Sequence, residues 1–430
     1  MFKRTGLLLC CVLLLLVSWA AVLGMKTPLE KQTALIALAE AQMKKGTYAN
    51  AQPYLEQAVS YNTKNTRSAL EMLKDVYLAL DYIREYESIM GILASRDDCT
   101  AEVFGEYARY QVNRGSLAES LAVLRRGIEK TGDGALTDLY EELRYAFSYG
   151  SNIYDDVTEF QYGMIQVRSG DYWGLADSNS KIVIPCAYDA VSTLDAANNG
   201  CAVALKDGKV VTLNRRAQII ANGDMTVSEI GNLSQNMIPL RIPGGKWILA
   251  NSALLSNNAE YDDLGMVFDS AVAMKKSDKW GVVSVDGKTI VPFEYDEIIM
   301  DELGRCYAQG AVFARKGDTV SLFVGGKLQP VSYEGARPFP YQGWAAVKTG
   351  GKWGYIDVTG AVRIQPQYDD ALSFGGRLAP VKLGELWGYA APSGKVVIEP
   401  QFLMAKSFYG RSAPVLTERG YFFLMLVETL

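Results

Sequence analysis

Lys279-Trp-Gly-Val-Val-Ser284 and Lys352-Trp-Gly-Tyr-Ile-Asp357 are two copies of one short pattern, a Trp-Gly pair followed by apolar residues. Four such pairs occur, at Trp173-Gly174, Trp280-Gly281, Trp353-Gly354 and Trp387-Gly388. A second pair, Tyr-Asp, recurs around these copies and begins at positions 154, 188, 261, 295 and 368, with weaker forms at Tyr333-Glu334 and Phe402. Adjacent copies lie 34 to 38 residues apart, and the wide gap from 188 to 261 fits two units. A fixed period of this length is typical of proteins built from one repeated supersecondary unit.

Each unit predicts three short β-strands. An apolar alternation such as Leu378-Ala-Pro-Val-Lys382 follows the Tyr-Asp pair, and the Trp-Gly strand comes after a turn. A last Ile/Val-rich strand ends in a proline, at Pro185, Pro292, Pro366 and Pro400. Three such strands cannot bury a hydrophobic face alone, so neighbouring units must stack on one another.

The signature residues have structural roles in this scheme. We expect the tryptophan to fill the space between units, because it is a large flat apolar body. The glycine after it avoids a clash with a neighbour or permits a bulge, and the proline ends the last strand because it lacks an N–H. The aspartate of Tyr-Asp is expected to accept hydrogen bonds from backbone N–H groups in the following turn.

These motifs resemble the WG (KWG) repeat family of bacterial proteins. The resemblance covers residues 151–430 and gives seven units plus a partial eighth. It implies an all-β repeat array, propeller-like or a β-solenoid, that acts as an interaction scaffold without a defined shared ligand. A closed ring and an open superhelix both stay open. The motif is degenerate at Gly208-Lys-Val210, Trp247-Ile248 and Ser321-Leu322.

Residues 27–150 carry a helical pattern instead. Gly46-Thr-Tyr-Ala-Asn-Ala51 and Gly115-Ser-Leu-Ala-Glu-Ser120 repeat one shape 69 residues apart, and Asp81-Tyr82 lies midway. This spacing resembles two periods of a tetratricopeptide (TPR) array, and a generic array of helical hairpins is the alternative. Small residues at 51, 58, 120 and 127 would let helices approach closely, while Tyr54, Leu55 and Leu124 fill the grooves between hairpins. A closing helix is expected from Leu136 to Tyr149.

Residues 1–26 predict an N-terminal transmembrane helix. Lys3 and Arg4 precede an uncharged apolar run from Leu7 to Leu23, which is near the lower length limit of a spanning helix. We interpret it as an uncleaved signal anchor, and a cleaved signal peptide is the alternative. The expected location is therefore a single-pass protein of the cell membrane with its bulk outside the cytoplasm, or a secreted protein after cleavage. The overall fold class is multidomain α + β.

Composition excludes several functions. The chain has no histidine, so a Ser-His-Asp triad and a His-ligated metal site are impossible. Its net charge is −5 without a block of Lys or Arg, which speaks against nucleic acid as a partner. No C-x-x-C motif is present. Cys186 and Cys201 could pair in an oxidising compartment, although small buried thiols are the favoured interpretation.

The acidic doublets allow three interpretations, at Asp155-Asp156, Asp262-Asp263 and Asp369-Asp370. They could bind Ca²⁺ or act as the paired acids of a glycosidase. We favour turn capping, because the doublets repeat with the fold and lack the D-x-D-x-D-G spacing of a calcium loop. We therefore expect no enzyme: no catalytic, cofactor-binding or metal-binding residue is assigned.

Three aromatic residues, Tyr341, Trp344 and Tyr409, fall outside the regular Trp-Gly register and are the candidates for a ligand surface. The leading hypothesis is a non-catalytic scaffold at the bacterial cell surface that binds protein partners through the helical groove and the β-repeat face. The alternative is a carbohydrate or cell-wall binding module that uses exposed aromatic rings. A membrane contact would be made through the N-terminal helix.

The expected orientation leads to a first prediction. Protease added to intact cells should remove a C-terminal tag from the chain while a cytoplasmic control protein survives, because the repeats should face outward. A tag that is protected in intact cells and cut only after lysis would contradict this orientation.

Overall fold

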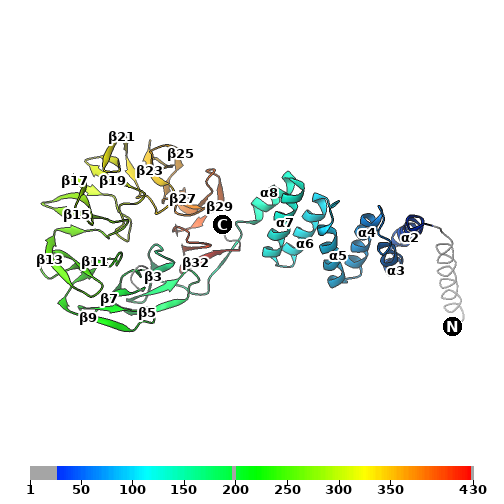
Figure 1. Cartoon of the computed structure of the whole chain (residues 1–430), viewed down its shortest axis with the longest axis horizontal. Coiled ribbons are helices and arrows are strands. Elements are labelled where there is room, and N and C mark those ends of the chain that lie inside the picture. Colours follow the sequence, from blue (N-terminus) through cyan, green and yellow to red (C-terminus); the bar gives the residue numbers. More distant parts are fainter. Residues whose placement is uncertain (1–26, 196–199, 428–430) are drawn as a thin grey trace. The chain divides into compact units, whose positions relative to one another are not determined.

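The computed structural model describes residues 27–195 and 200–427, which divide into two compact units at Arg144/Tyr145 (Figure 1). The expected signal anchor falls in residues 1–26 and lies outside the described residues. Among the residues that are described, no helix combines the length and apolar character needed to cross a membrane.

The first unit consists, in its described part, of seven helices. Their bounds are α2 (Pro28–Met43), α3 (Tyr48–Val59), α4 (Thr66–Ala79), α5 (Ile83–Ser95), α6 (Ala101–Asn113), α7 (Leu117–Thr131) and α8 (Gly134–Leu143). A capping box starts α2, because the side chains of Thr27 and Glu30 each accept a hydrogen bond from the other's backbone N–H.

Six of these seven helices form three equivalent hairpins, α2/α3, α4/α5 and α6/α7, and α8 follows the last one. The turn between the helices of each pair holds one residue with positive φ, namely Gly46 (73°), Asp81 (59°) and Gly115 (77°). The 34- to 35-residue spacing of these turns is the predicted TPR-like period. The residue after each turn has nearly the same backbone angles in all three, so the weak middle copy folds like the other two.

The predicted small residues do lie where the helices touch. Ala51, Ala58 and Ser120 are fully buried. A Cβ added at Gly127 would lie 2.8 Å from Leu136 and from Phe104, so only glycine allows α7 to pack this closely. Tyr54, Leu55 and Leu124 fill the core as expected.

The closing helix is shorter than predicted. Helix α8 ends at Leu143, and Phe147–Tyr149 forms a strand, β1, of the second unit instead of continuing the helix to Tyr149. The aromatic residues of β1 pack within that unit, since Phe147 contacts Phe402 and Tyr149 contacts Phe422. Tertiary pairing therefore decides the structure of this segment, whatever its local helical pattern.

The second unit consists, among the described residues, of eight antiparallel sheets of four strands each. We call the sheets blades 1 to 8. Blades 1 to 4 comprise β2 to β5 (Asp156–Val157, Met164–Ser169, Tyr172–Asp177, Ile182–Tyr188), β6 to β9 (Ala190–Val191, Ala202–Lys206, Lys209–Leu213, Ile219–Thr226), β10 to β13 (Glu229–Ile230, Met237–Arg241, Trp247–Asn251, Ser256–Tyr261) and β14 to β17 (Asp263–Leu264, Ala271–Lys276, Lys279–Ser284, Thr289–Tyr295).

The remaining blades follow the same plan. Blades 5 to 8 comprise β18 to β21 (Glu297–Ile298, Ala311–Lys316, Thr319–Val324, Lys327–Tyr333), β22 to β25 (Gly335–Ala336, Ala345–Thr349, Lys352–Ile356, Val362–Tyr368), β26 to β29 (Asp370–Ala371, Ala379–Leu383, Leu386–Ala390, Val396–Phe402) and β30 to β32 (Met404–Ala405, Ser412–Thr417, Gly420–Leu426).

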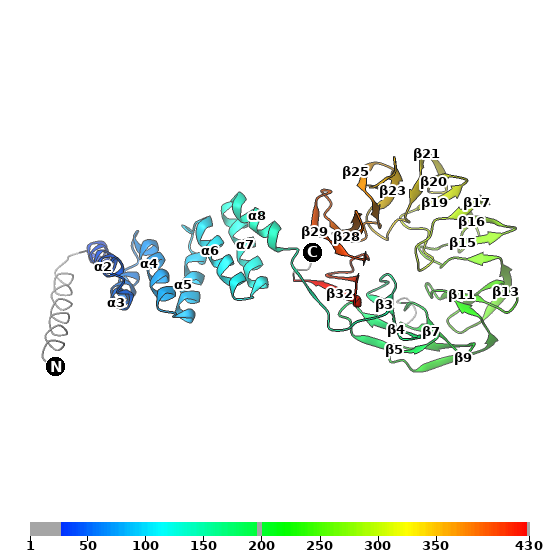
Figure 2. The same ribbon diagram turned by 180° about the vertical axis from the view of Figure 1, so that it is seen from behind.

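The blades form a closed ring, which excludes the open superhelix (Figures 1 and 2). Seven blades are continuous in sequence, and the eighth has three strands of its own plus β1. Strand β1 pairs with β32 from Phe147↔Leu426 to Tyr149↔Leu424. The N-terminal and C-terminal strands of the unit therefore share one sheet and close an eight-bladed β-propeller.

Each blade has four strands, where three were predicted. The missed strand is the first, which has only two residues and directly follows the Tyr-Asp pair, as in β26 after Asp369. Two residues cannot show an alternating pattern, so sequence periodicity does not reveal this strand.

The signature aromatics and glycine form one structural unit in each regular blade. Trp353 pairs across the sheet with Tyr368, and the register then shifts so that Tyr355 pairs with Ile364. The outer strand carries two extra residues in this bulge. A Cβ at Gly354 would lie 2.6 Å from the Ile364 carbonyl oxygen, so the bulge requires glycine there. The equivalent carbonyl obstructs a Cβ at Gly174, Gly281 and Gly388.

The proline has a different role from the predicted one. Strand β25 continues through Pro366 to Tyr368, and the same holds in blades 1, 4 and 7. Pro366 lies inside the bulge, where the ladder needs no N–H, and so it does not end the strand.

The predicted capping by aspartate is confirmed. Asp369 Oδ2 accepts from Gly384 N at 2.7 Å, in the hairpin turn of the next blade. Asp155 and Asp296 do the same with Gly170 and Gly317, at 2.7 and 2.8 Å. The other carboxylate oxygen forms an ion pair with the lysine that precedes the tryptophan in the previous blade, as in Lys352–Asp369 (2.5 Å) and Lys279–Asp296 (2.6 Å).

Stacking between neighbouring blades also agrees with the prediction. One buried cluster joins Trp353 and Tyr355 of blade 6 to Ala371 and Val381 of blade 7. Tyr355 Oη reaches across to donate to the Leu372 carbonyl oxygen at 3.1 Å. The core is thus a chain of interfaces between blades.

Trp280 repeats this arrangement in blade 4. It pairs across the sheet with Tyr295, and its side chain is buried in a cluster that also contains Ile298 and Phe323 of blade 5. The ring of Tyr295 packs edge-on against Phe323, at 5.5 Å between ring centres. Trp280 is therefore a packing residue at the interface between blades 4 and 5, which is the structural role expected of a signature tryptophan.

The bulge predicts that Gly354→Ala destabilises the propeller by about 2 kcal/mol, because the new methyl group must displace backbone atoms. Gly335→Ala is the matched control in the same blade, since its Cβ would meet neighbours at an ordinary 3.4 Å. Urea unfolding of both variants measures the difference. Equal midpoints for the two variants would contradict the assigned role of the Trp-Gly glycine.

Candidate functional site

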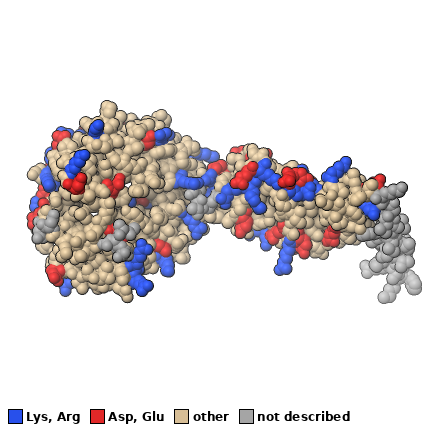
Figure 3. Space-filling view, in the orientation of Figure 1, with Lys and Arg blue, Asp and Glu red and all other residues tan. Residues whose placement is uncertain are grey.

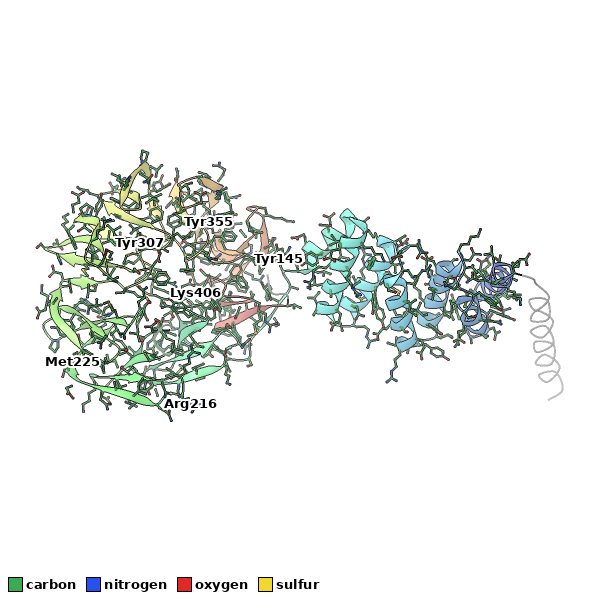
Figure 4. The ribbon with its side chains drawn as sticks, viewed as in Figure 1. Tyr145, Arg216, Met225, Tyr307, Tyr355 and Lys406 are labelled. Atoms are coloured by element: carbon green, nitrogen blue, oxygen red, sulfur yellow. The ribbon has the colours of Figure 1, made fainter. Side chains whose placement is uncertain are left out.

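A cavity of about 550 Å³ is the candidate site in the propeller. Six blades contribute to it, mainly with the connections that join their first strands to their second. Figure 4 shows Lys406, one of the lining residues, toward the middle of the ring. The segments that contribute lining residues are 159–162, 268, 300–305, 337–342, 372–375 and 404–409.

The longest of these connections, residues 299–310 of blade 5, crosses toward the opposite blades. Arg305 Nη1 donates to the Phe160 carbonyl oxygen of blade 1 at 3.4 Å. Asn232 of blade 3 donates to the Leu303 carbonyl oxygen at 3.1 Å. Lys406 of blade 8 pairs with Glu302 at 2.6 and 2.7 Å. The loop therefore connects four blades and forms one wall of the cavity.

The shape of this loop is set by Asp301. Its Oδ1 accepts from the backbone N–H groups of Leu303 and Arg305, both at 3.0 Å, and its Oδ2 lies 2.5 Å from Arg305 Nε. Gly304 adopts φ of 86°, and a Cβ there would lie 2.9 Å from Met266 N. The turn thus holds the Arg305 guanidinium in place with its charge matched.

Lys406 and Glu302 form the second matched pair. The Lys406 side chain is only 7% exposed, whereas that of Glu302 is 38% exposed at the cavity wall. Burial lowers the pKa of Lys406, and the carboxylates of Glu302 and Glu159 more than reverse that effect, so the ammonium stays charged. Burial raises the pKa of Glu302, and Lys406 opposes this.

Glu159 lines the cavity without an ion pair among the described residues. Its carboxylate accepts only long hydrogen bonds, from Ser407 N at 3.3 Å and Ser407 Oγ at 3.4 Å. Burial raises the pKa of Glu159 to about 7, against the opposing influence of Lys406. The side chain is therefore poised to change charge near neutral pH.

Gln161 is the second polar group in the wall with unmet bonding capacity. It is 3% exposed, yet neither its Oε1 nor its Nε2 has a hydrogen-bond partner within the described structure. Buried amides are normally bonded, and an unmet donor or acceptor costs about 1–3 kcal/mol. Gln161 belongs to the cavity wall, and both of its amide atoms are covered in the free structure.

Two of the three predicted surface aromatics lie at this cavity. Tyr341 is 68% exposed and packs edge-on against Phe268, and Tyr409 is 44% exposed and lies beside Phe160. Trp344 is partly buried and does not line the cavity. Its backbone pairs with Phe374 and its ring lies 5.3 Å from that ring, which makes it a packing residue between blades 6 and 7.

The Trp-Gly pairs lie away from the cavity. Each belongs to the third strand of its blade, and none of the four lines the cavity: Trp173-Gly174, Trp280-Gly281, Trp353-Gly354 and Trp387-Gly388. Trp280 and Trp353 are 8% and 9% exposed, which leaves little of either ring for a ligand. The signature residues that mark the family in the sequence are thus not the residues that form its site.

The lining residues follow the signature aromatic by a few positions. Glu159 and Gln161 come five and seven residues after Tyr154, and Ser407 comes five after Phe402. Aligning the units and comparing these positions could have identified the site. The 38-residue spacing from 295 to 333 also marks the long loop.

The helical unit has its own hollow, of about 710 Å³, formed between helices α4, α5, α6 and α8. Its lining combines Tyr86 and Tyr110 with Glu106 and Arg109. Glu106 is paired with Lys74 beneath the surface. This hollow is the part of the helical array that a partner segment could enter.

Within the described structure, the cysteines discussed above form no disulfide, and the acidic doublets act as caps. Cys186 and Cys201 are free thiols, the latter buried. Second members of the acidic doublets cap their own strands, as Asp156 does with Val157 N and Asp370 with Ala371 N. No group of three or more metal-ligating side chains gathers anywhere in the part of the chain that is described.

Fold and site together define a repeat-built β-propeller with a cavity lined by its blade connections. The family model of the WG-containing repeat matches residues 153–173, 173–209, 280–302, 329–353, 353–387 and 387–410, so the chain is a WG-repeat protein. These matches leave out residues 210–279 and 303–328, where the degenerate Trp247-Ile248 and Ser321-Leu322 stand.

One of the solved structures that align with this chain is the crystal structure of BamB from Moraxella catarrhalis. The alignment covers 65% of this chain and 100% of the BamB chain, at 9% identity and a TM-score of 0.46. No curated protein sequence gives a significant match.

The raised pKa of Glu159 predicts a pH-dependent stability. Between pH 4.5 and 7 the unfolded chain has lost this proton while the folded chain keeps it, so stability falls as pH rises through this window. Glu159→Gln removes this loss and should be more stable than the native protein at pH 8 by up to about 3 kcal/mol, with little difference near pH 4.5. Urea unfolding at both pH values measures it. Glu297→Gln, at an exposed carboxylate of blade 5, is the control; an equal gain there would refute the assignment.

Proposed function

We propose that this protein is a non-catalytic interaction scaffold, which binds protein partners through the helical hollow and the cavity face of the propeller. The convergence of six blade connections on one cavity with exposed aromatic rings carries this proposal. A purely structural ring would need to fill its centre, whereas this one leaves room for several side chains of a partner.

The exposed rings support binding at this place. Tyr341 and Tyr409 keep large apolar surfaces in water beside the cavity. Tyrosine is enriched among the residues that dominate binding energy at protein interfaces, because it offers much rigid area with little entropy to lose. Pro338 and Pro340 stiffen the segment that presents Tyr341.

The absence of catalysis is part of the proposal. Asp301 and Glu302 are each held by a basic side chain, which leaves Glu159 as one carboxylate without an acid or base partner of matched geometry in the described wall. The lack of histidine removes the most frequent general base.

A carbohydrate is the second candidate ligand, and the exposure of Tyr341 and Tyr409 favours it. Flat rings beside a polar cavity suit the apolar faces of sugars, and a cell-wall glycan would fit the proposed placement outside the cytoplasm. Binding to purified peptidoglycan or polysaccharide that is lost in Tyr341→Ala would support this candidate over the first.

Charge gives little support for nucleic acid as a ligand. On the face seen in Figure 3, basic and acidic side chains intermingle. A nucleic-acid surface needs a continuous basic patch to neutralise phosphates. We keep the proposed partner as a protein, at or outside the cell membrane.

The scaffold proposal predicts a position-specific loss of binding. Proteins that co-purify with the tagged chain from its native cells should be lost in Tyr341→Glu, because a charge replaces the apolar ring at the cavity. Tyr172→Glu is the matched control, since Tyr172 is 46% exposed and lies on β4, away from the cavity. Quantitative mass spectrometry compares the two. Equal partner recovery with both variants would exclude the cavity as the binding face.

A further inference from the structure

We propose that the propeller cavity takes an extended peptide segment that places a lysine or arginine side chain beside Glu159 and one of its backbone amides against Gln161. This inference rests on the proposed scaffold function and names the chemistry of its partner. The unmet bonding capacity of two neighbouring groups in one cavity wall carries it.

The charges of the cavity leave one carboxylate unmatched. Asp301 pairs with Arg305, and Glu302 pairs with Lys406. Arg337, the remaining basic residue in the described wall, lies 3.3 Å from Asp370 and over the ring of Trp353. Glu159 therefore adds an excess negative charge that a cationic side chain from outside would neutralise.

The rings around Glu159 suit a cation as well. Tyr409 lines the same wall and is 44% exposed, and its ring packs 5.7 Å from that of the buried Phe160. Aromatic faces attract ammonium and guanidinium groups. The cavity already contains one such contact, because Arg305 lies 5.6 Å from the centre of the Phe268 ring.

Gln161 indicates that the cation is carried by a peptide. Its amide has an unused donor and an unused acceptor, and a backbone peptide group offers the complementary acceptor and donor. Glu159 and Gln161 belong to one segment of the cavity wall, so one peptide could approach both residues. Both amide atoms of Gln161 are covered in the free structure, and its side chain must turn toward the cavity to meet the peptide backbone. A simple amine would satisfy only Glu159.

The probes for this proposal are three tripeptides with acetylated and amidated ends: alanine-arginine-alanine, alanine-citrulline-alanine and alanine-glutamate-alanine. Citrulline has the shape of arginine without its charge. Isothermal titration calorimetry with the full chain at pH 8 should show at least tenfold tighter binding of the arginine peptide than of the other two.

Two variants separate the contributions. Glu159→Gln should abolish the preference for arginine over citrulline, because the attraction between charges is gone. Gln161→Leu should weaken the arginine and citrulline peptides by a similar factor, because the backbone contact is lost. Glu297→Gln, on β18 of blade 5 and outside the cavity lining, should leave all affinities unchanged.

A pH series on the native protein tests the same point without any variant. Lys406, Glu302 and Arg305 face Glu159 from the loops of blades 8 and 5, and Tyr389 and Tyr421 lie behind it. The arginine peptide should bind progressively more weakly as the pH falls below 7, until its affinity equals that of the citrulline peptide, which does not change with pH. Protonation of Glu159 is the reason.

Three outcomes would overturn the inference: equal binding of all three peptides, an arginine preference that survives Glu159→Gln, or no binding of any peptide at 10 mM. A loss of partner recovery in Tyr341→Glu together with any of these would leave the scaffold function standing and reject only the basic peptide. If the arginine peptide binds as expected but Tyr341→Glu has no effect on partner recovery, the basic-peptide site would stand and the proposed partner-binding face would be rejected.

Discussion

The bulge between the third and fourth strands is the constraint on which the propeller depends. In blades 1, 4, 6 and 7 it requires a residue without a Cβ directly after the tryptophan, because the carbonyl oxygen of the outer strand occupies that space. In blade 3, where Ile248 follows Trp247, the register shift lies one residue later. The bulge tolerates proline, since two residues of the outer strand are released from the ladder. After the bulge, the last aromatic residue of the outer strand pairs with the tryptophan, as Tyr368 does with Trp353. The next residue, Asp369, then caps the hairpin turn of the following blade. Each repeat thereby fixes the position of its neighbour, and eight repeats close into a ring.

This arrangement separates stability from binding. The Trp-Gly strands pack against the next blade in the same way in the regular blades, whereas the connections from first to second strand differ in length and composition. They meet at one cavity, so unrelated residues from six blades become neighbours there. The Lys406–Glu302 pair joins two of these connections and the Arg305–Asp301 pair shapes one of them, and the cost of burying their charges is offset by short hydrogen bonds. In the described wall, Glu159 has no ion pair, the Gln161 amide has no hydrogen-bond partner, and Arg337 Nε also lacks one.

The sequence predicted the repeated part of the fold well. Trp353, Gly354 and Tyr368 recur at a fixed period, and periodicity together with simple sterics led to stacked β units and to capping by aspartate. It did not lead to the two-residue first strand or to β1, because both are defined by pairing with other segments and β1 with one far away in the chain. Tyr341 and Tyr409 were identified because they break the register. Glu159 and Gln161 were missed, since only ring closure brings residues of blades 1, 5 and 8 together.

The character of the cavity follows from the same physics as the ring. The Glu159 carboxylate, which has no ion pair among the described residues, and the unbonded amide of Gln161 each lower the stability of the free protein, and both residues belong to the cavity wall. If these residues served only to fill the centre of the ring, apolar side chains would be more stable at both positions. A group that destabilises the folded chain when alone has most to gain from a complementary ligand, because binding then supplies the interaction that folding left unmet. The proposed occupant of the cavity would supply these interactions, which the packing of the propeller itself does not.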